Sequence, residues 1–207
     1  MFPFLTAFMI FIVVLAVLRA RATRSAKERT DAFWEKENAA NSARKVDLST
    51  ITYFQFDPES LPDAPDQSEE LKNARTAIEE ASKKQMLNLN GISNTDLKLT
   101  YGPQNLDELT IYGDHFSELE ESLLSYGMLL HDAGFLKEAI AVLEKGVLLP
   151  TDLTQNYIRL ADYYSEAGTE SKKADLLALA EKNLSGYALT TVQRHLNPPD
   201  ETPDKGH

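Results

Sequence analysis

The sequence contains no cysteine. This absence excludes a disulfide framework, a thiolate zinc site, an iron–sulfur cluster and a cysteine nucleophile. A glycine-rich phosphate loop, a GxSxG elbow and a kinase signature are also missing. The four histidines, His115, His131, His195 and His207, show no metal-ligand spacing. We therefore expect no enzymatic activity, no metal and no cofactor.

Positive charge is scarce in most of the chain, whose formal net charge is −11. Residues 19–45 carry eight Lys/Arg and four Asp/Glu, whereas residues 46–207 carry 13 and 28, a net charge of −15. Nucleic-acid binding depends mainly on the neutralisation of phosphates by Lys and Arg. We therefore expect no nucleic-acid partner, and a protein partner that presents basic groups.

The first 18 residues contain no charged side chain, and Arg19, Arg21, Arg24, Lys27 and Arg29 follow them. A helix of this length would span about 27 Å, close to the ~30 Å hydrocarbon core of a bilayer. Basic residues that flank a span stay on the cytoplasmic side. The pattern predicts a single-pass transmembrane helix at 1–18, a basic juxtamembrane helix at 19–45 and a body that faces the cytoplasm.

Residues 46–67 have the composition of a linker that contains proline. Pro58, Pro62 and Pro65 preclude a continuous helix. Tyr53, Phe54 and Phe56 have two interpretations: packing along the domain, which we favour, or a docking motif.

Residues 68–113 are expected to form an amphipathic helix at 68–87, followed by an ordered loop rich in Asn, Gly, Asp and Thr. Asn94, Thr95 and Asp96 are interpreted as turn formers, with a ligand site as the alternative.

Helical periodicity resumes at Asp114 and is interrupted at Gly134, near Pro150 and at Gly168. The two glycines are 34 residues apart, a period typical of stacked helical hairpins. Side chains also match in size at this offset. The matching positions are Leu123 with Tyr157, Tyr126 with Leu160, Gly127 with Ala161, Leu130 with Tyr164, Leu143 with Leu177, and Gly146 with Ala180.

Residues 125–152, SYGMLLHDAGFLKEAIAVLEKGVLLPTD, resemble a tetratricopeptide repeat. In such a repeat a small residue allows two helices to approach, a Gly ends the first helix and an Ala in the second packs closely. Gly127, Gly134 and Ala139 occupy these places. The second copy departs from the pattern, because Lys173 occupies the small position and Ala174 follows one residue late.

The resemblance implies an all-α fold of the α-solenoid type, with two hairpins and a closing helix at 114–196. The composition of residues 197–207 predicts a disordered tail. The resemblance also places the first helix of each hairpin on a concave face. Two interpretations of this face stay open: a groove that binds a basic or amphipathic peptide segment, or an ordinary solvated face that the 68–87 helix covers in part. The candidate groove residues are Glu121, Leu124, Met128, His131, Gln155, Ile158, Arg159, Asp162 and Ser165.

Three function classes follow from these features. The first is a membrane-anchored scaffold or adaptor that binds a protein partner. The second is a structural subunit of a membrane protein complex. The weakest is an enzyme or ligand sensor that uses the loop at 90–105.

Overall fold

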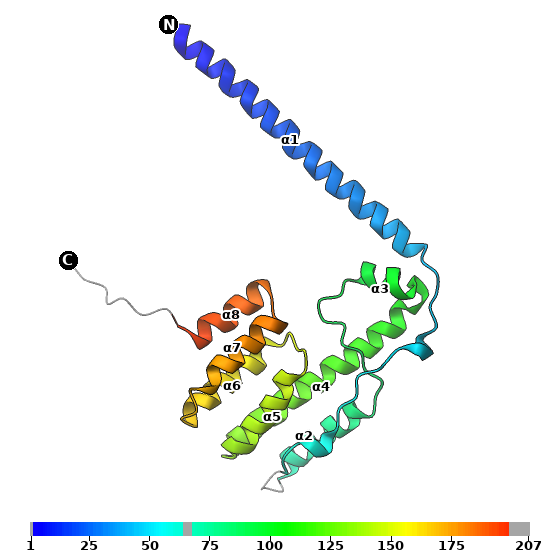
Figure 1. Cartoon of the computed structure of the whole chain (residues 1–207), viewed down its shortest axis with the longest axis vertical. Coiled ribbons are helices and arrows are strands. Elements are labelled where there is room, and N and C mark those ends of the chain that lie inside the picture. The colour runs from blue at the N-terminus through cyan, green and yellow to red at the C-terminus, as the bar shows by residue number, and fades with distance from the viewer. Residues whose placement is uncertain (1, 64–67, 199–207) are drawn as a thin grey trace, which may run out of the picture. The chain divides into compact units, whose positions relative to one another are not determined.

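The computed structural model describes the backbone of residues 2–63 and 68–198, and side chains from residue 7 onward within these ranges. The described chain is all-α and contains no strand (Figure 1). The predicted tail from residue 199 onward, residues 64–67 of the predicted linker, residue 1 and the side chains of residues 2–6 lie outside the described part.

The chain divides into two compact units. Unit 1 comprises residues 1–50 and 92–107, and unit 2 comprises residues 51–91 and 108–207. Unit 1 contains α1 (Phe2–Asn41), α3 (Asn94–Tyr101) and the short 3-10 helices η1 (Leu48–Thr50) and η3 (Pro103–Asn105).

Unit 2 contains η2 (Pro58–Ser60), α2 (Glu69–Ser82), α5 (Leu136–Leu148), α6 (Thr154–Glu166), α7 (Lys172–Asn183) and α8 (Gly186–Leu196). It also contains α4 (Leu106–Asp132) except for the first two residues of that helix.

The predicted transmembrane anchor is wrong. Among the side chains that the structure describes, no helix combines the length and the apolar character required to cross a bilayer. In α1 the apolar residues 7–18 run directly into Arg19, Arg21 and Arg24. A membrane location for the chain, with the body facing the cytoplasm, is therefore not supported.

Polar contacts join α3 to the end of α1 within unit 1. Lys36 Nζ donates to Asp96 Oδ1 at 2.7 Å, and Thr95 Oγ1 donates to Glu37 Oε2 at 2.7 Å. Lys98 Nζ forms an ion pair with the Glu37 carboxylate and also donates to Asn41 Oδ1 at 2.9 Å. Thr95 and Asp96 therefore bind other residues of the protein. They are two of the three residues in the ligand site that we considered as an alternative.

Residues 94–101 and 106–113, which we expected to belong to an ordered loop, are helical. Ser93 caps α3, and its Oγ accepts a hydrogen bond from the Asp96 backbone N–H at 3.2 Å. In α4, Leu109 and Phe116 are fully buried on one face. Tyr112 and Gly113 hid this periodicity, since both are weak helix formers.

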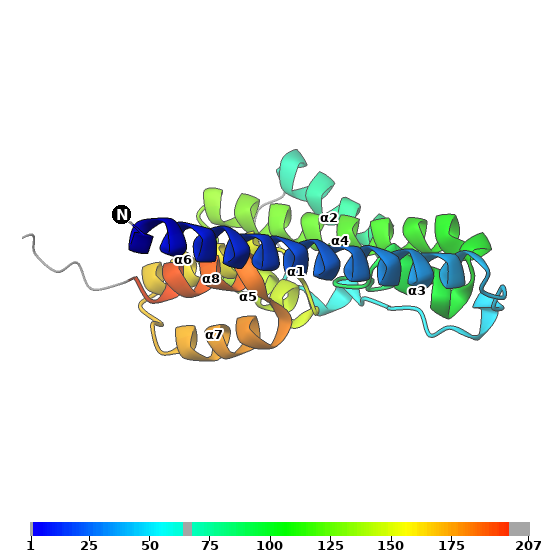
Figure 2. The ribbon, with the colours of Figure 1, turned by 90° about the horizontal axis from the view of Figure 1, so that it is seen from above.

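The core of unit 2 is one continuous apolar cluster to which every α-helix of the unit contributes. In Figures 1 and 2, α5 to α8 form a group of adjacent helices, and α6 packs against α5, α7 and α8. Gly127 of α4 lies so close to α5 that an added Cβ would be 2.5 Å from Leu143 Cδ2. This contact explains why α4 has no side chain at the position.

The expected helix at 68–87 extends in the structure only from Glu69 to Ser82, with Ser68 as its N-cap. Beyond it, Met86 pairs with Phe54, whose backbone N–H donates to Met86 O at 2.8 Å. The Phe54 ring meets Phe116 edge to face at 5.1 Å, and the Tyr53 ring meets Tyr112 at 5.2 Å. The aromatic residues of the 51–56 segment therefore pack along the domain, as the favoured interpretation stated.

The residues proposed for repeat packing lie mostly in this core. Buried members are Leu123, Tyr126, Gly127, Leu130, Ala139, Leu143, Gly146, Tyr157, Leu160, Ala161, Tyr164 and Ala180. Leu177 is half-buried. Gly134 and Gly168 are exposed and adopt left-handed conformations with φ of 86° and 69°, which glycine reaches at little cost. These positions agree with helical hairpins, but the assignment to a tetratricopeptide repeat stays a prediction.

Candidate functional site

The nine residues of the candidate groove lie on α4 and α6. None is fully buried, and Leu124 and Ile158 pack against the core with part of their surface. We call this set the α4–α6 face. Its exposed members are Glu121, Gln155, Arg159 and Ser165, and its half-buried members are Leu124, Met128, His131, Ile158 and Asp162. Because spacings of three and four residues place side chains on one side of a helix, each helix contributes one stripe. The face therefore offers accessible apolar and charged groups together.

One end of the α4–α6 face is occupied by contacts between the two helices. The His131 ring stacks on Tyr163, with the ring centroids 4.1 Å apart and the planes 7° from parallel. His131 Nε2 hydrogen-bonds to Glu166 Oε2 at 2.7 Å. His131 also lies in the last turn of α4, where the helix dipole favours a cationic side chain. These contacts give His131 a role in joining α4 to α6.

Asp162 is likewise engaged inside the protein. Its Oδ1 is 2.7 Å from Nε2 of His195, which lies in the last turn of α8. The accessible centre of the α4–α6 face is therefore formed by the remaining residues. These are Glu121, Leu124 and Met128 of α4 and Gln155, Ile158 and Arg159 of α6, and Ser165 lies one turn beyond Asp162.

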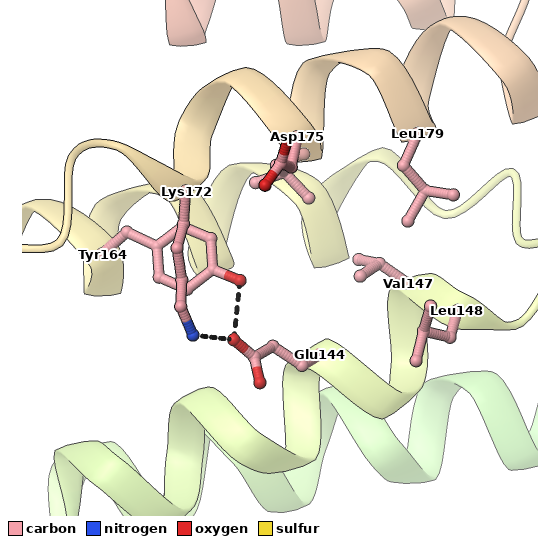
Figure 3. A pocket seen from close by; sticks show the side chains of 8 residues that line it. Glu144, Val147, Leu148, Tyr164, Lys172, Asp175 and Leu179 are labelled. Carbon is pink, nitrogen blue, oxygen red and sulfur yellow. Dashed lines mark hydrogen bonds and ion pairs between the residues drawn. The ribbon is translucent and has the colours of Figure 1, made fainter.

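A second feature, which the sequence did not suggest, is a cleft of about 280 Å³ between α5 and α7, here named the α5–α7 cleft (Figure 3). Val147, Leu148, Leu176 and Leu179 form its apolar part. Leu148 is 67% exposed, which is unusual for a leucine that follows a buried valine. The cleft thus presents apolar surface to the solvent.

The other end of the α5–α7 cleft is a polar triangle. Tyr164 Oη and Lys172 Nζ both donate to Glu144 Oε1, at 2.8 and 2.7 Å, and the Lys172 ammonium lies 5.3 Å from the centre of the Tyr164 ring (Figure 3). Burial and the neighbouring Glu144 carboxylate raise the pKa of Tyr164. Tyr164 therefore stays a neutral hydrogen-bond donor, and the ionic groups hold the start of α7 to α5.

A third feature is a cavity of about 520 Å³ with a mixed polar and apolar lining. We call it the asparagine cavity. Its lining comes from the connection after α2, the connection before α6 and the junction of α7 with α8. The lining residues are Asn88, Asn90, Gly91, Pro150, Asp152, Lys182, Asn183, Leu184, Ser185 and Ala188.

A layer of buried polar side chains lies next to the asparagine cavity. Glu120 is 3% exposed, and Thr151 and Asn156 are fully buried. Burial raises the pKa of Glu120 to about 7, while hydrogen bonding to the side chains of Thr151 and Asn90 opposes the rise. No described residue hydrogen-bonds to Glu120 Oε1 or to the side-chain amide of Asn156. Sequence reasoning missed this layer because a single Glu in an acidic helix gives no sign of burial.

Comparison with known proteins finds no matching family, no matching curated protein and no matching solved structure.

Proposed function

We propose that this protein is a scaffold or adaptor that binds a protein partner through the α4–α6 face of a tetratricopeptide-like helical array. The observation that carries the proposal is the accessibility of this face. Leu124, Met128 and Ile158 are only half-buried, and the charged Glu121 and Arg159 beside them are exposed. A surface that combines apolar anchors with charged groups is suited to a peptide with both kinds of side chain.

The charge of the chain favours a basic or amphipathic segment as the ligand. Residues 46–207 carry a net charge of −15, and complementary charge increases the rate at which a basic partner associates. The half-buried apolar residues would supply affinity, because binding energy concentrates in well-packed apolar and aromatic anchors.

A peptide-display selection against the purified chain tests this function. We expect the selected peptides to pair large apolar residues with Lys or Arg. A variant carrying Leu124→Ser, Met128→Ala, Ile158→Ser and Arg159→Ala should keep its helical circular dichroism spectrum and lose these peptides. Selected peptides that bind this folded variant as tightly as the wild type would refute the α4–α6 face as the binding site.

The matched control is the double variant Ile111→Ser and Tyr187→Ser. These side chains are apolar and well exposed, at 51% and 84%, and neither belongs to the α4–α6 face. The control should retain the selected peptides. Equal losses in both variants would indicate non-specific binding to exposed apolar surface.

A constitutive subunit of a larger protein complex is the second candidate. The observation that favours it is the exposed apolar part of the α5–α7 cleft, in particular Leu148. Contiguous exposed apolar surface marks sites of protein association. Under this alternative, Leu148→Lys would abolish co-purification with the complex, and the α4–α6 variant would leave it intact.

A further inference from the structure

The asparagine cavity is built from three connections that are distant in the sequence. Asn88 Nδ2 donates to Pro150 O at 2.9 Å, and the Asn90 backbone N–H donates to Asn88 Oδ1 at 2.9 Å. Asn183 Nδ2 donates to Tyr157 Oη at 3.1 Å. The side chains of Asn88 and Asn183 are thus held by the protein in one orientation. Fixed polar groups in a cavity reduce the entropy cost of binding a ligand.

The cavity lining mixes polar and apolar groups and carries one side chain of each charge. Asp152 lies just before α6, and Lys182 lies in the last turn of α7. The volume of about 520 Å³ falls within the range of small-molecule sites. A ligand that carries one positive and one negative charge would complement this lining.

The start of α8 is another part of the cavity lining that carries hydrogen-bond donors. Ser185 and Ala188 line the cavity, and α8 has no acidic residue in its first turn. The Ser185 side chain makes no capping hydrogen bond within the described part of the chain. The first backbone N–H groups of a helix lack partners inside the helix, and together with a lysine they favour a carboxylate.

The buried polar layer connects to the cavity through two lining residues. The Asn90 side chain hydrogen-bonds to the Glu120 carboxylate, and Asn183 hydrogen-bonds to Tyr157. No described residue hydrogen-bonds to Glu120 Oε1 or to the side-chain amide of Asn156. Through Asn90 the cavity lining is therefore linked to a buried carboxylate.

We propose that the asparagine cavity binds a small zwitterion of the α-amino-acid class. Its carboxylate lies toward Lys182 and the start of α8, and its ammonium group lies toward Asp152 and the asparagine side chains. This inference is independent of the α4–α6 face and gives the protein a ligand-binding function beyond partner binding.

Titration calorimetry with the full chain tests the proposal, with glycine, L-serine and L-glutamine as probes. At least one probe should bind saturably. For L-serine the comparison extends to N-acetyl-L-serine, which lacks the ammonium group, and to L-serinamide, which lacks the carboxylate. Each derivative of a binding amino acid should bind at least about tenfold more weakly. No saturable binding of any amino acid below about 10 mM, or equal binding of the derivatives, would overturn the proposal.

Two single substitutions assign the charges. Lys182→Gln should weaken the binding of the amino acid, because the carboxylate has lost its partner. It should also abolish the difference in affinity between the amino acid and its amide. Asp152→Asn should abolish the difference in affinity between the amino acid and its N-acetyl derivative. Both residues are exposed, so both variants should melt like the wild type. If each variant keeps the full preference for the zwitterion, the cavity is not the binding site.

The matched control is Lys137→Gln, which removes an exposed lysine of α5 that does not line the cavity. It should leave affinity and selectivity unchanged. A loss equal to that of Lys182→Gln would show that binding follows the overall charge of the protein, and it would contradict the assigned site.

Discussion

The two units differ in what holds them together. In unit 1, α1 exposes its described residues from 7 to 36, and polar contacts of Lys36, Glu37, Lys98 and Asn41 attach α3 to it. In unit 2, buried residues from every α-helix form one apolar cluster. Burial of apolar surface stabilises more than an exposed ion pair such as Lys36–Asp96 does, whereas the Lys98–Glu37 pair is largely buried. Unit 2 should therefore unfold cooperatively, whereas the attachment of α3 in unit 1 should respond to salt and pH.

The largest expected effect comes from truncating the core of unit 2. Phe116→Ala removes a fully buried ring that contacts Phe54, and it should cost about 3–5 kcal/mol of unfolding free energy. Urea unfolding followed by circular dichroism measures the loss. Phe33→Ala in α1 is the matched control, because its ring is 54% exposed and exposed substitutions change stability by only about 0.5 kcal/mol.

Hydrogen exchange sharpens the comparison between the units. In the Phe116→Ala variant, amides of α5 and α6 should exchange faster, and those of α3 should keep their wild-type rates. Equal acceleration in α3 would show that the two units share one cooperative transition.

The second largest effect is a pH dependence of the stability of unit 2, which is caused by Glu120. Its pKa is about 7 in the folded chain, and 4.5 is the ordinary value for Glu. Between these values the folded state binds more protons than the unfolded state, so the contribution of Glu120 to stability falls as the pH rises. The loss is complete above about pH 7 and amounts to roughly 3 kcal/mol.

Glu120→Gln tests this pH dependence because glutamine keeps the shape and cannot ionise. The variant should be more stable than the wild type at pH 8 by up to about 3 kcal/mol, and the difference should shrink towards pH 5. Urea unfolding at several pH values measures it. A constant difference between variant and wild type across this range would contradict a buried, titrating Glu120.

The sequence predicted the helical content and the breaks at Gly134 and Gly168. It could do so because these depend on local periodicity and on glycine conformation. It did not predict the helical start of α4, because Tyr112 and Gly113 weaken the local pattern. The contacts of His131 with Glu166 and of Asp162 with His195 were also missed. The 34-residue repeat offset could have indicated these contacts, because the partners are 35 and 33 residues apart in the sequence.

The α5–α7 cleft and the asparagine cavity were not predictable by the same means. Glu144 and Lys172 come from different hairpins, and the cavity joins residues from Asn88 to Ala188. Such sites depend on how helices pack over long sequence separations, which hydrophobic periodicity does not specify. For α1 the sequence analysis predicted a feature that the structure does not support. The apolar composition at its beginning was interpreted as a membrane span, and no described helix has the required length and apolar character.

The smallest expected effect concerns the attachment of α3 to α1. Hydrogen bonds from Lys98 and Thr95 lower the pKa of Glu37, and the Lys36 ammonium lowers the pKa of Asp96. Carboxylates with lowered pKa stabilise the fold above their unfolded pKa values, and this stabilisation is lost as the pH falls through the folded values. Acidification below about pH 4 should therefore release α3 before unit 2 unfolds.

High salt should weaken the same contacts, since the Debye length falls to about 3 Å at 1 M. The measurement is amide exchange in α3 of the wild type and of the Glu37→Gln, Lys98→Met double variant at low and high salt. The wild type should lose protection with salt, and the variant should start at the lower level and respond less. An equal salt response in both proteins would show that these ionic contacts do not hold α3, and that unit 1 depends on apolar burial around Leu97 as unit 2 depends on its core.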